Sequence, residues 1–194
     1  RRYFALPENW NAGKRLLLHF GAVDQEAAVF VNGQKAGEHR GGYNAFTVDA
    51  TAFVQPQNEL IVRVYDDTDA SWHTRGKQRT KRGGIWYTPQ SGIWQTVWME
   101  WVPEAYIQRV RLIPDIDRGE LELTVFASRP GEGTAVLQGE RFAFTVGTPV
   151  RLPVQDQRLW SPDDPWLYPL ELHFGEDRVE SYFAMRKTEV RAGK

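Results

Sequence analysis

The sequence contains no cysteine, which excludes disulfide bonds, thiolate chemistry and cysteine-ligated zinc sites. It also lacks any apolar run approaching the roughly 20 residues of a membrane-spanning helix. Charge of one sign is not in excess, because 24 basic and 25 acidic residues leave a net charge of −1. No global field therefore favours nucleic acid or an anionic membrane, and neither partner is predicted.

Signatures of common catalytic sites are missing too. The sequence has no HExxH, no GxSxG and no phosphate-binding GxxxxGK[ST] motif. Asp66, Asp67 and Asp69 offer oxygen ligands of the kind that calcium prefers, but few other carboxylates flank them, which favours a solvated loop. We therefore predict no catalytic residue, no metal site and no cofactor in this chain.

Aromatic residues, in contrast, are abundant, with eight Trp, seven Tyr and ten Phe among 194 residues. In a β-protein they suit sheet cores and also carbohydrate contact, since aromatic faces cover the C–H faces of sugar rings. Apolar residues alternate in runs such as Arg15–Phe20 and Leu60–Val64, whereas no stretch keeps a helical period. The chain is predicted to be all-β.

Pro103 marks the expected boundary between two domains, at 1–103 and 104–190. The second half predicts seven short strands, at Tyr106–Ile113, Glu120–Phe126, Thr134–Gln138, Arg141–Val146, Val150–Val154, Leu167–Phe174 and Arg178–Met185. Seven such strands over about 80 residues are typical of an immunoglobulin-like β-sandwich, here without its cysteine pair.

In the first half, Val29–Phe46 is dense in turn residues between strand-like runs. Asn32-Gly33 predicts a tight hairpin whose two turn residues have positive φ. Gly41-Gly42 suits a further turn or a close approach of the backbone. Asn58-Glu59 resembles the dipeptide that carries the acid in many sugar hydrolases. We interpret it as a structural turn, because no second carboxylate motif accompanies it.

A long segment without apolar periodicity, Asp66–Gly84, precedes strands expected at Ile85–Tyr87 and Gly92–Trp101. Loops of this length are uncommon inside compact domains and are often functional. Lys77–Arg82 is a short basic cluster, interpreted as a solvated loop. The candidate sugar-binding residues, which combine rings for stacking with groups that bond hydroxyls, are Trp72, His73, Arg75, Gln78, Trp86 and Tyr87. Packing of the segment against its own sheet or a neighbouring domain is an equal alternative.

Several ordered motifs resemble one known family. They are LPxxW from Leu6, FGAV from Phe20, VFVNGQKAGEHRGGYNAFTVD from Val29, NELIV from Asn58, SGIWQTV from Ser91, LWSPDDPWLY from Leu159 and FAMRK from Phe183. The sequence is similar to glycoside hydrolase family 2, the family of β-galactosidases, β-glucuronidases and β-mannosidases. Ala184 is one departure, because glycine is usual there.

The resemblance implies a sugar-binding jelly-roll (galactose-binding-like) β-sandwich followed by an immunoglobulin-like one. In the family, the acid/base and nucleophile glutamates lie in a (β/α)₈ barrel that follows these domains, so this chain is expected to be an inactive accessory part that helps to shape the barrel's substrate cleft. The first strand or two of the jelly roll are expected upstream of Arg1. The implied partners are a β-glycoside and the barrel, with a homo-oligomeric parent left open.

Two alternatives remain at this point. One is a free-standing pair of carbohydrate-binding modules, and the other is a purely structural β-sandwich tandem. The sequence indicates neither the sugar nor the cellular compartment.

Overall fold

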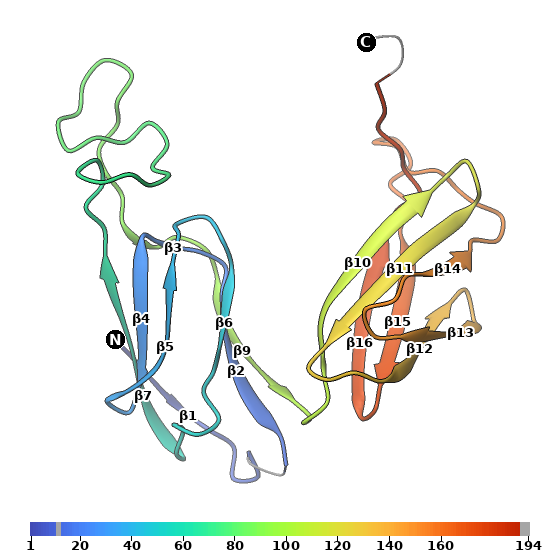
Figure 1. The fold of residues 1–194 in the computed structure, drawn as a ribbon, viewed down its shortest axis with the longest axis horizontal. Helices are drawn as coiled ribbons and strands as arrows, with labels where there is room; N and C mark the ends of the chain where they lie inside the picture. The colour runs from blue at the N-terminus through green and yellow to red at the C-terminus, as the bar shows by residue number, and fades with distance from the viewer. Residues whose placement is uncertain (11–12, 191–194) are drawn as a thin grey trace. The chain divides into compact units, whose positions relative to one another are not determined.

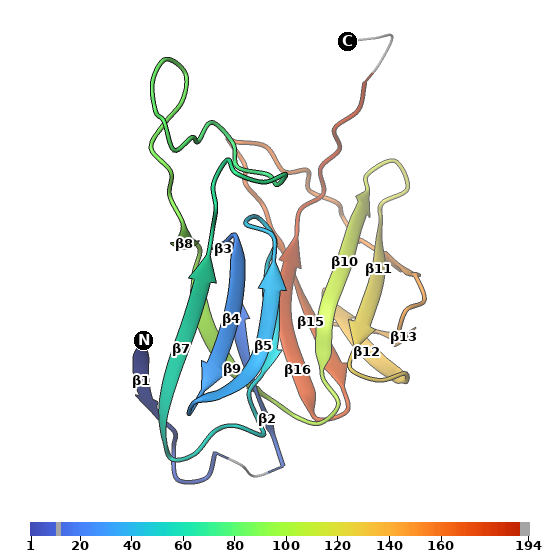
Figure 2. The ribbon, with the colours of Figure 1, turned by 60° about the vertical axis from the view of Figure 1, so that its left-hand side comes forward.

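The computed structural model describes residues 1–10 and 13–190, and every regular element within them is a β-strand (Figures 1 and 2). The all-β prediction is therefore confirmed. The chain divides into two compact units, Arg1–Val102 and Pro103–Lys194. None of the described residues forms a helix that could cross a membrane.

The first unit is a β-sandwich of nine strands. These are β1 (Arg2–Ala5), β2 (Arg15–Phe20), β3 (Val23–Asp24), β4 (Glu26–Val31), β5 (Gln34–Arg40), β6 (Phe46–Asp49), β7 (Gln57–Tyr65), β8 (Gly92–Ile93) and β9 (Val97–Val102). A four-stranded sheet has the order β1-β7-β4-β5, a three-stranded sheet has the order β6-β2-β9, and β3 pairs with β8 alone. All of these pairings are antiparallel.

Period-two patterning places the core of this unit between the two larger sheets. In β4 the inward residues Ala27, Val29 and Val31 are buried, and in β2 Leu16, Leu18 and Phe20 are buried opposite them. Removing such side chains from water supplies about 25 cal/mol per Å² of apolar surface. One face of each strand therefore holds the sandwich together and leaves its strand ends free to carry loops.

The turn between β4 and β5 is the predicted hairpin, with φ of 51° at Asn32 and 78° at Gly33. The Asn32 side chain also crosses to β7. Its Nδ2 donates to Asn58 Oδ1 and to the Phe53 carbonyl, and its Oδ1 accepts from the Glu59 amide, each at 2.9 Å. This residue therefore joins the hairpin tip to the next strand of the sheet.

Three local predictions need correction. Asn58 and Glu59 lie inside β7, not on a turn, because Asn58 is buried and bonds the Gln55 backbone through both side-chain atoms. Ile85–Tyr87 forms only isolated bridges to Gly83 and Gln78. The strand expected at Gly92–Trp101 is divided into β8 and β9, because the chain changes partner from β3 to β2 between them.

The second unit is another β-sandwich, with seven strands as predicted. They are β10 (Ile107–Asp115), β11 (Glu120–Ala127), β12 (Glu132–Leu137), β13 (Glu140–Thr145), β14 (Val150–Pro153), β15 (Tyr168–Phe174) and β16 (Asp177–Phe183). One sheet has the order β10-β11-β14 and the other has the order β13-β12-β15-β16. Their inward faces enclose one core, which includes Leu121, Leu123, Leu170 and Leu172.

Candidate functional site

The segment from Asp66 to Ser91, between β7 and β8, extends beyond the strand ends of the first unit and is drawn in green in Figures 1 and 2. Asp66 holds both of its ends. Its Oδ1 accepts from the Thr68 amide at 2.8 Å, and its Oδ2 accepts from the Ser91 hydroxyl. The Asp66 side chain is only 3% exposed, whereas Ser91 at the other end is exposed.

His73 lies beside this closure, in contact with two carboxylates. Its Nε2 is 3.5 Å from Asp66 Oδ1, and its Nδ1 is 3.4 Å from Asp67 Oδ1 and 3.1 Å from Ser71 Oγ. The ligand atoms of His73 and the two aspartates lie within 4.8 Å of one another, close enough to share a metal ion. The imidazole contacts both carboxylates directly, so this cluster by itself requires no metal.

Asp24, at the end of β3, is a buried carboxylate whose Oδ1 has no hydrogen-bond partner among the described residues. It lies under Gly42, where an added Cβ would overlap Asp24 Oδ1 and come within 2.8 Å of its Cγ. Burial and then the negative charge of Asp66 raise the pKa of Asp24 above its ordinary value, while His73 acts in the opposite direction. An uncompensated acceptor thus lies below the loop end of the sandwich.

This raised pKa gives a prediction for Asp24→Asn. When the pKa of a carboxyl group is higher in the folded state than in the unfolded state, the folded protein becomes less stable as pH rises through the folded-state pKa. The variant should therefore resist urea better than wild type at pH 7. The advantage should disappear near pH 3, below the ordinary aspartate pKa of about 3.9. Urea unfolding at pH 7 and at pH 3 measures the difference in stability between the variant and wild type. Asp163→Asn, at an exposed position, is the control. An equal advantage at both pH values would contradict it.

A pocket of about 520 Å³ opens over Asp24, within the usual range for small-molecule sites. Its lining residues are Asp24, Tyr43, Gln78, Gln90, Ser91, Gly92, Ile93 and Trp94. The Tyr43 and Trp94 rings meet edge to face, with centroids 5.9 Å apart, and both are about half exposed. Trp94 Nε1 donates to the Gly42 carbonyl at 2.7 Å, which fixes the ring. The two exposed rings can stack on a pyranose, whereas the unpartnered Asp24 oxygen lies below the accessible surface.

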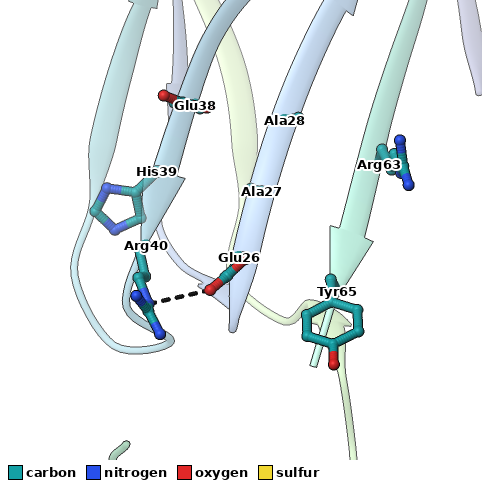
Figure 3. Close-up of a pocket in the computed structure, with 8 residues that line it drawn as sticks. All are labelled: Glu26, Ala27, Ala28, Glu38, His39, Arg40, Arg63 and Tyr65. Carbon is teal, nitrogen blue, oxygen red and sulfur yellow. Dashed lines mark ion pairs between the residues drawn. The ribbon is translucent and has the colours of Figure 1, made fainter. Parts of the chain in front are cut away.

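A second depression, of about 710 Å³, lies on the outer face of β4, β5 and β7 (Figure 3). Ala27 and Ala28 are among its lining residues, and Arg40 pairs there with Glu26 at 3.1 Å. Its charges therefore partly neutralise one another, and Tyr65 is the one Trp, Tyr or Phe side chain among its lining residues. The pocket over Asp24 is the better candidate, because it combines two rings with an unpartnered acceptor.

The six sugar-binding candidates from the sequence do not form one surface. Gln78 lines the pocket and is fixed there, since its Oε1 accepts from the Gln90 amide at 2.5 Å. His73 is buried in the carboxylate cluster, whereas Trp72 is fully exposed. Arg75 is half-buried and accepts a hydrogen bond from Gln78 through its carbonyl.

The last two candidates belong to the far part of the segment. Trp86 lies under the Arg79 guanidinium at 3.9 Å, and Tyr87 is 69% exposed. Sequence reasoning missed Asp24, Tyr43, Gln90 and Trp94. No local signal marks them, because Asp24 is followed by the polar residues Gln25 and Glu26.

Comparison with known proteins decides the family. Residues 1–103, more than half of the chain, match the model for glycosyl hydrolases family 2, sugar binding domain. The chain belongs to glycosyl hydrolase family 2. The jelly-roll assignment of the first unit and the presence of a second β-sandwich after it agree with this membership.

Relatives of this family 2 chain include two kinds of glycosidase. It is 26% identical over 189 residues to a β-glucuronidase of Paenibacillus borealis, covering 87% of this chain and 32% of the relative. It is 27% identical over 188 residues to a β-galactosidase of Thermoanaerobacter pseudethanolicus, covering 87% of this chain and 24% of the relative.

A solved structure shows the same fold. It is the β-glucuronidase from Ruminococcus gnavus in complex with uronic deoxynojirimycin, with a TM-score of 0.78 at 19% identity. The match covers 98% of this chain but 36% of that chain. The family 2 chain thus spans well under half the length of each of these relatives.

Proposed function

We propose that this chain is the non-catalytic accessory part of a longer family 2 glycosidase, which hydrolyses O-glycosidic bonds in a C-terminal (β/α)₈ barrel. The pocket over Asp24 helps to shape the substrate cleft. The observation that carries the proposal is the convergence of Tyr43, Trp94, Gln78 and the unpartnered Asp24 carboxylate at the loop end of a family 2 sugar-binding domain.

The carboxylates of this loop end support a binding role over a catalytic one. Retaining hydrolysis needs two carboxyl groups about 5–5.5 Å apart that both reach the glycosidic bond. Asp66 and Asp67 come within 4.8 Å of each other, yet both contact His73 and the Asp66 side chain is 97% buried. The burial of Asp66 and the contacts of both carboxylates with His73 support placing the reacting groups elsewhere in the longer protein.

Trp94→Ala tests the proposal in the longest protein encoded by the same reading frame. Loss of one stacking ring should raise KM for a β-glycoside by roughly tenfold, or about 1.4 kcal/mol, and change kcat less. Steady-state kinetics on nitrophenyl β-galactoside and β-glucuronide measure the effect. Tyr65→Ala, which removes an exposed ring from the outer sheet face, should leave KM unchanged. An unaltered KM in Trp94→Ala would show that the pocket does not line the substrate cleft.

Titration of the isolated chain separates this role from that of a free-standing binding module. Calorimetry with galactose, glucuronate and mannose should give at most millimolar binding, because the pocket is shallow and supplies one wall of the cleft. Micromolar affinity for any of the three would instead favour a self-sufficient carbohydrate-binding module.

A further inference from the structure

Residues Lys77–Tyr87, called the arm below, form a closed projection of the long segment. The Tyr87 amide donates to the Lys77 carbonyl at 2.8 Å, and the Arg79 amide donates to the Tyr87 carbonyl at 3.2 Å. Further out, Gly83 and Trp86 exchange two backbone hydrogen bonds. Paired backbone groups therefore fix the arm along its length, although it contains no regular strand.

Side chains on the arm divide by function. Gln78 bonds the Arg75 carbonyl and the Gln90 amide, and Thr80 bonds Asp69 Oδ1 at 2.7 Å, so both anchor the arm to the rest of the segment. Lys77 and Arg79 flank Gln78 in the chain, and both are exposed to solvent.

The exposed side chains of the arm are strongly basic. Lys77, Arg79, Lys81 and Arg82 are all exposed, in a chain whose net charge is −1. Across the part of the chain that the structure describes, none of the four forms an ion pair with a carboxylate. Arg79 is held in place by stacking over Trp86, and the Tyr87 ring that follows Trp86 in the chain is exposed. Positive charge beside aromatic rings is the combination that recognises an anionic sugar chain.

We propose that the arm binds an acidic oligosaccharide, one with carboxylate or sulfate groups on its sugar units. The inference rests on the proposed function and specifies its ligand. Gln78 belongs to both the arm and the pocket over Asp24, so a chain that places one unit in the pocket continues onto the arm. Asp24 lines the pocket and disfavours an anion there, so a neutral unit occupies the pocket and the acidic units lie along the arm.

The test measures affinity of the 194-residue chain for a chondroitin hexasaccharide, which alternates uronate with a neutral amino sugar derivative. Its carboxyl-reduced form is the matched neutral ligand, and chondroitin sulfate distinguishes sulfate from carboxylate as the preferred group. At 50 mM NaCl we expect acidic forms to bind at least tenfold tighter than the reduced form. The preference should be lost at 0.5 M NaCl, where the Debye length falls to a few ångströms.

The variant K77Q/R79Q/K81Q should lose about tenfold in affinity for the acidic forms and little for the reduced form. The charge-preserving variant K77R/R79K/K81R should keep the wild-type affinity for the acidic forms. Lys14→Gln, Arg129→Gln and Arg141→Gln together remove the same charge at exposed positions outside the arm, and this control should bind like wild type.

Three results would overturn the proposal: equal affinity for acidic and reduced oligosaccharides, an equal loss in the control triple, or equally tight binding of a single-stranded oligothymidylate. The last would make the arm a general polyanion site. None of them bears on the role of Trp94, which the kinetics of the longer protein test separately. A lost acid preference with an intact Trp94 effect therefore rejects this inference alone.

Discussion

Replacement of Asn32 by alanine should destabilise the first unit by about 2–4 kcal/mol. Three side-chain hydrogen bonds are lost, which leaves the Glu59 amide and an Asn58 oxygen short of partners, at about 1–3 kcal/mol for a buried group. Alanine must also adopt the positive φ of 51° that asparagine tolerates, which costs roughly 1–2 kcal/mol. Urea unfolding, combined with hydrogen exchange read separately on β4–β7 peptides, measures the effect.

Asn32→Gly separates the two causes. Glycine accepts positive φ without strain, so this variant keeps the turn and loses only the side-chain bonds. It should be more stable than Asn32→Ala by about 1 kcal/mol and still clearly less stable than wild type. Stability of Asn32→Ala within 0.5 kcal/mol of wild type would show that the bonds to β7 contribute little.

Gly42→Ala should cost about 2–3 kcal/mol and also weaken sugar binding. The added methyl overlaps the Asp24 carboxylate and lies 3.2 Å from its Cβ, so a change of Asp24 rotamer alone does not relieve the clash. The backbone at Gly42 must then move, and its carbonyl is the acceptor that fixes Trp94. Thermal unfolding measures the loss of stability, and the KM of the longer protein for a β-glycoside measures the loss of sugar binding.

Asp24→Ala provides the partner for a double-mutant cycle with Gly42→Ala. If the clash with the Asp24 carboxylate is the cause, the double variant should be more stable than the sum of the single effects by at least 1 kcal/mol. Additive effects would place the strain elsewhere, in the backbone of the turn itself.

Much of the fold could be predicted because its strands are locally encoded. Arg15–Phe20 places Leu16, Leu18 and Phe20 at a period of two, and its bounds agree with β2. Asn32-Gly33 identifies its own turn type, since few other dipeptides adopt two positive φ values. The break between β8 and β9 was not predictable in this way, because it reflects a change of partner strand rather than any local pattern.

The pocket was beyond the reach of local patterns for the same reason. Asp24, Tyr43, Gln78 and Trp94 come from four separate parts of the chain and meet only through the sheet topology. The absence of apolar periodicity after Tyr65 correctly indicated an irregular segment. It could not indicate that His73 would be buried at the root of the segment while Trp72 beside it faces solvent.

The bond between Asp66 and Ser91 brings the two ends of the long segment together. The entropic cost of a longer loop grows slowly, by about 0.6 kcal/mol for each doubling of its length. An insertion in this segment should therefore cost the first unit little stability, provided that it spares His73, which contacts Asp66, and Gln78, which lines the pocket.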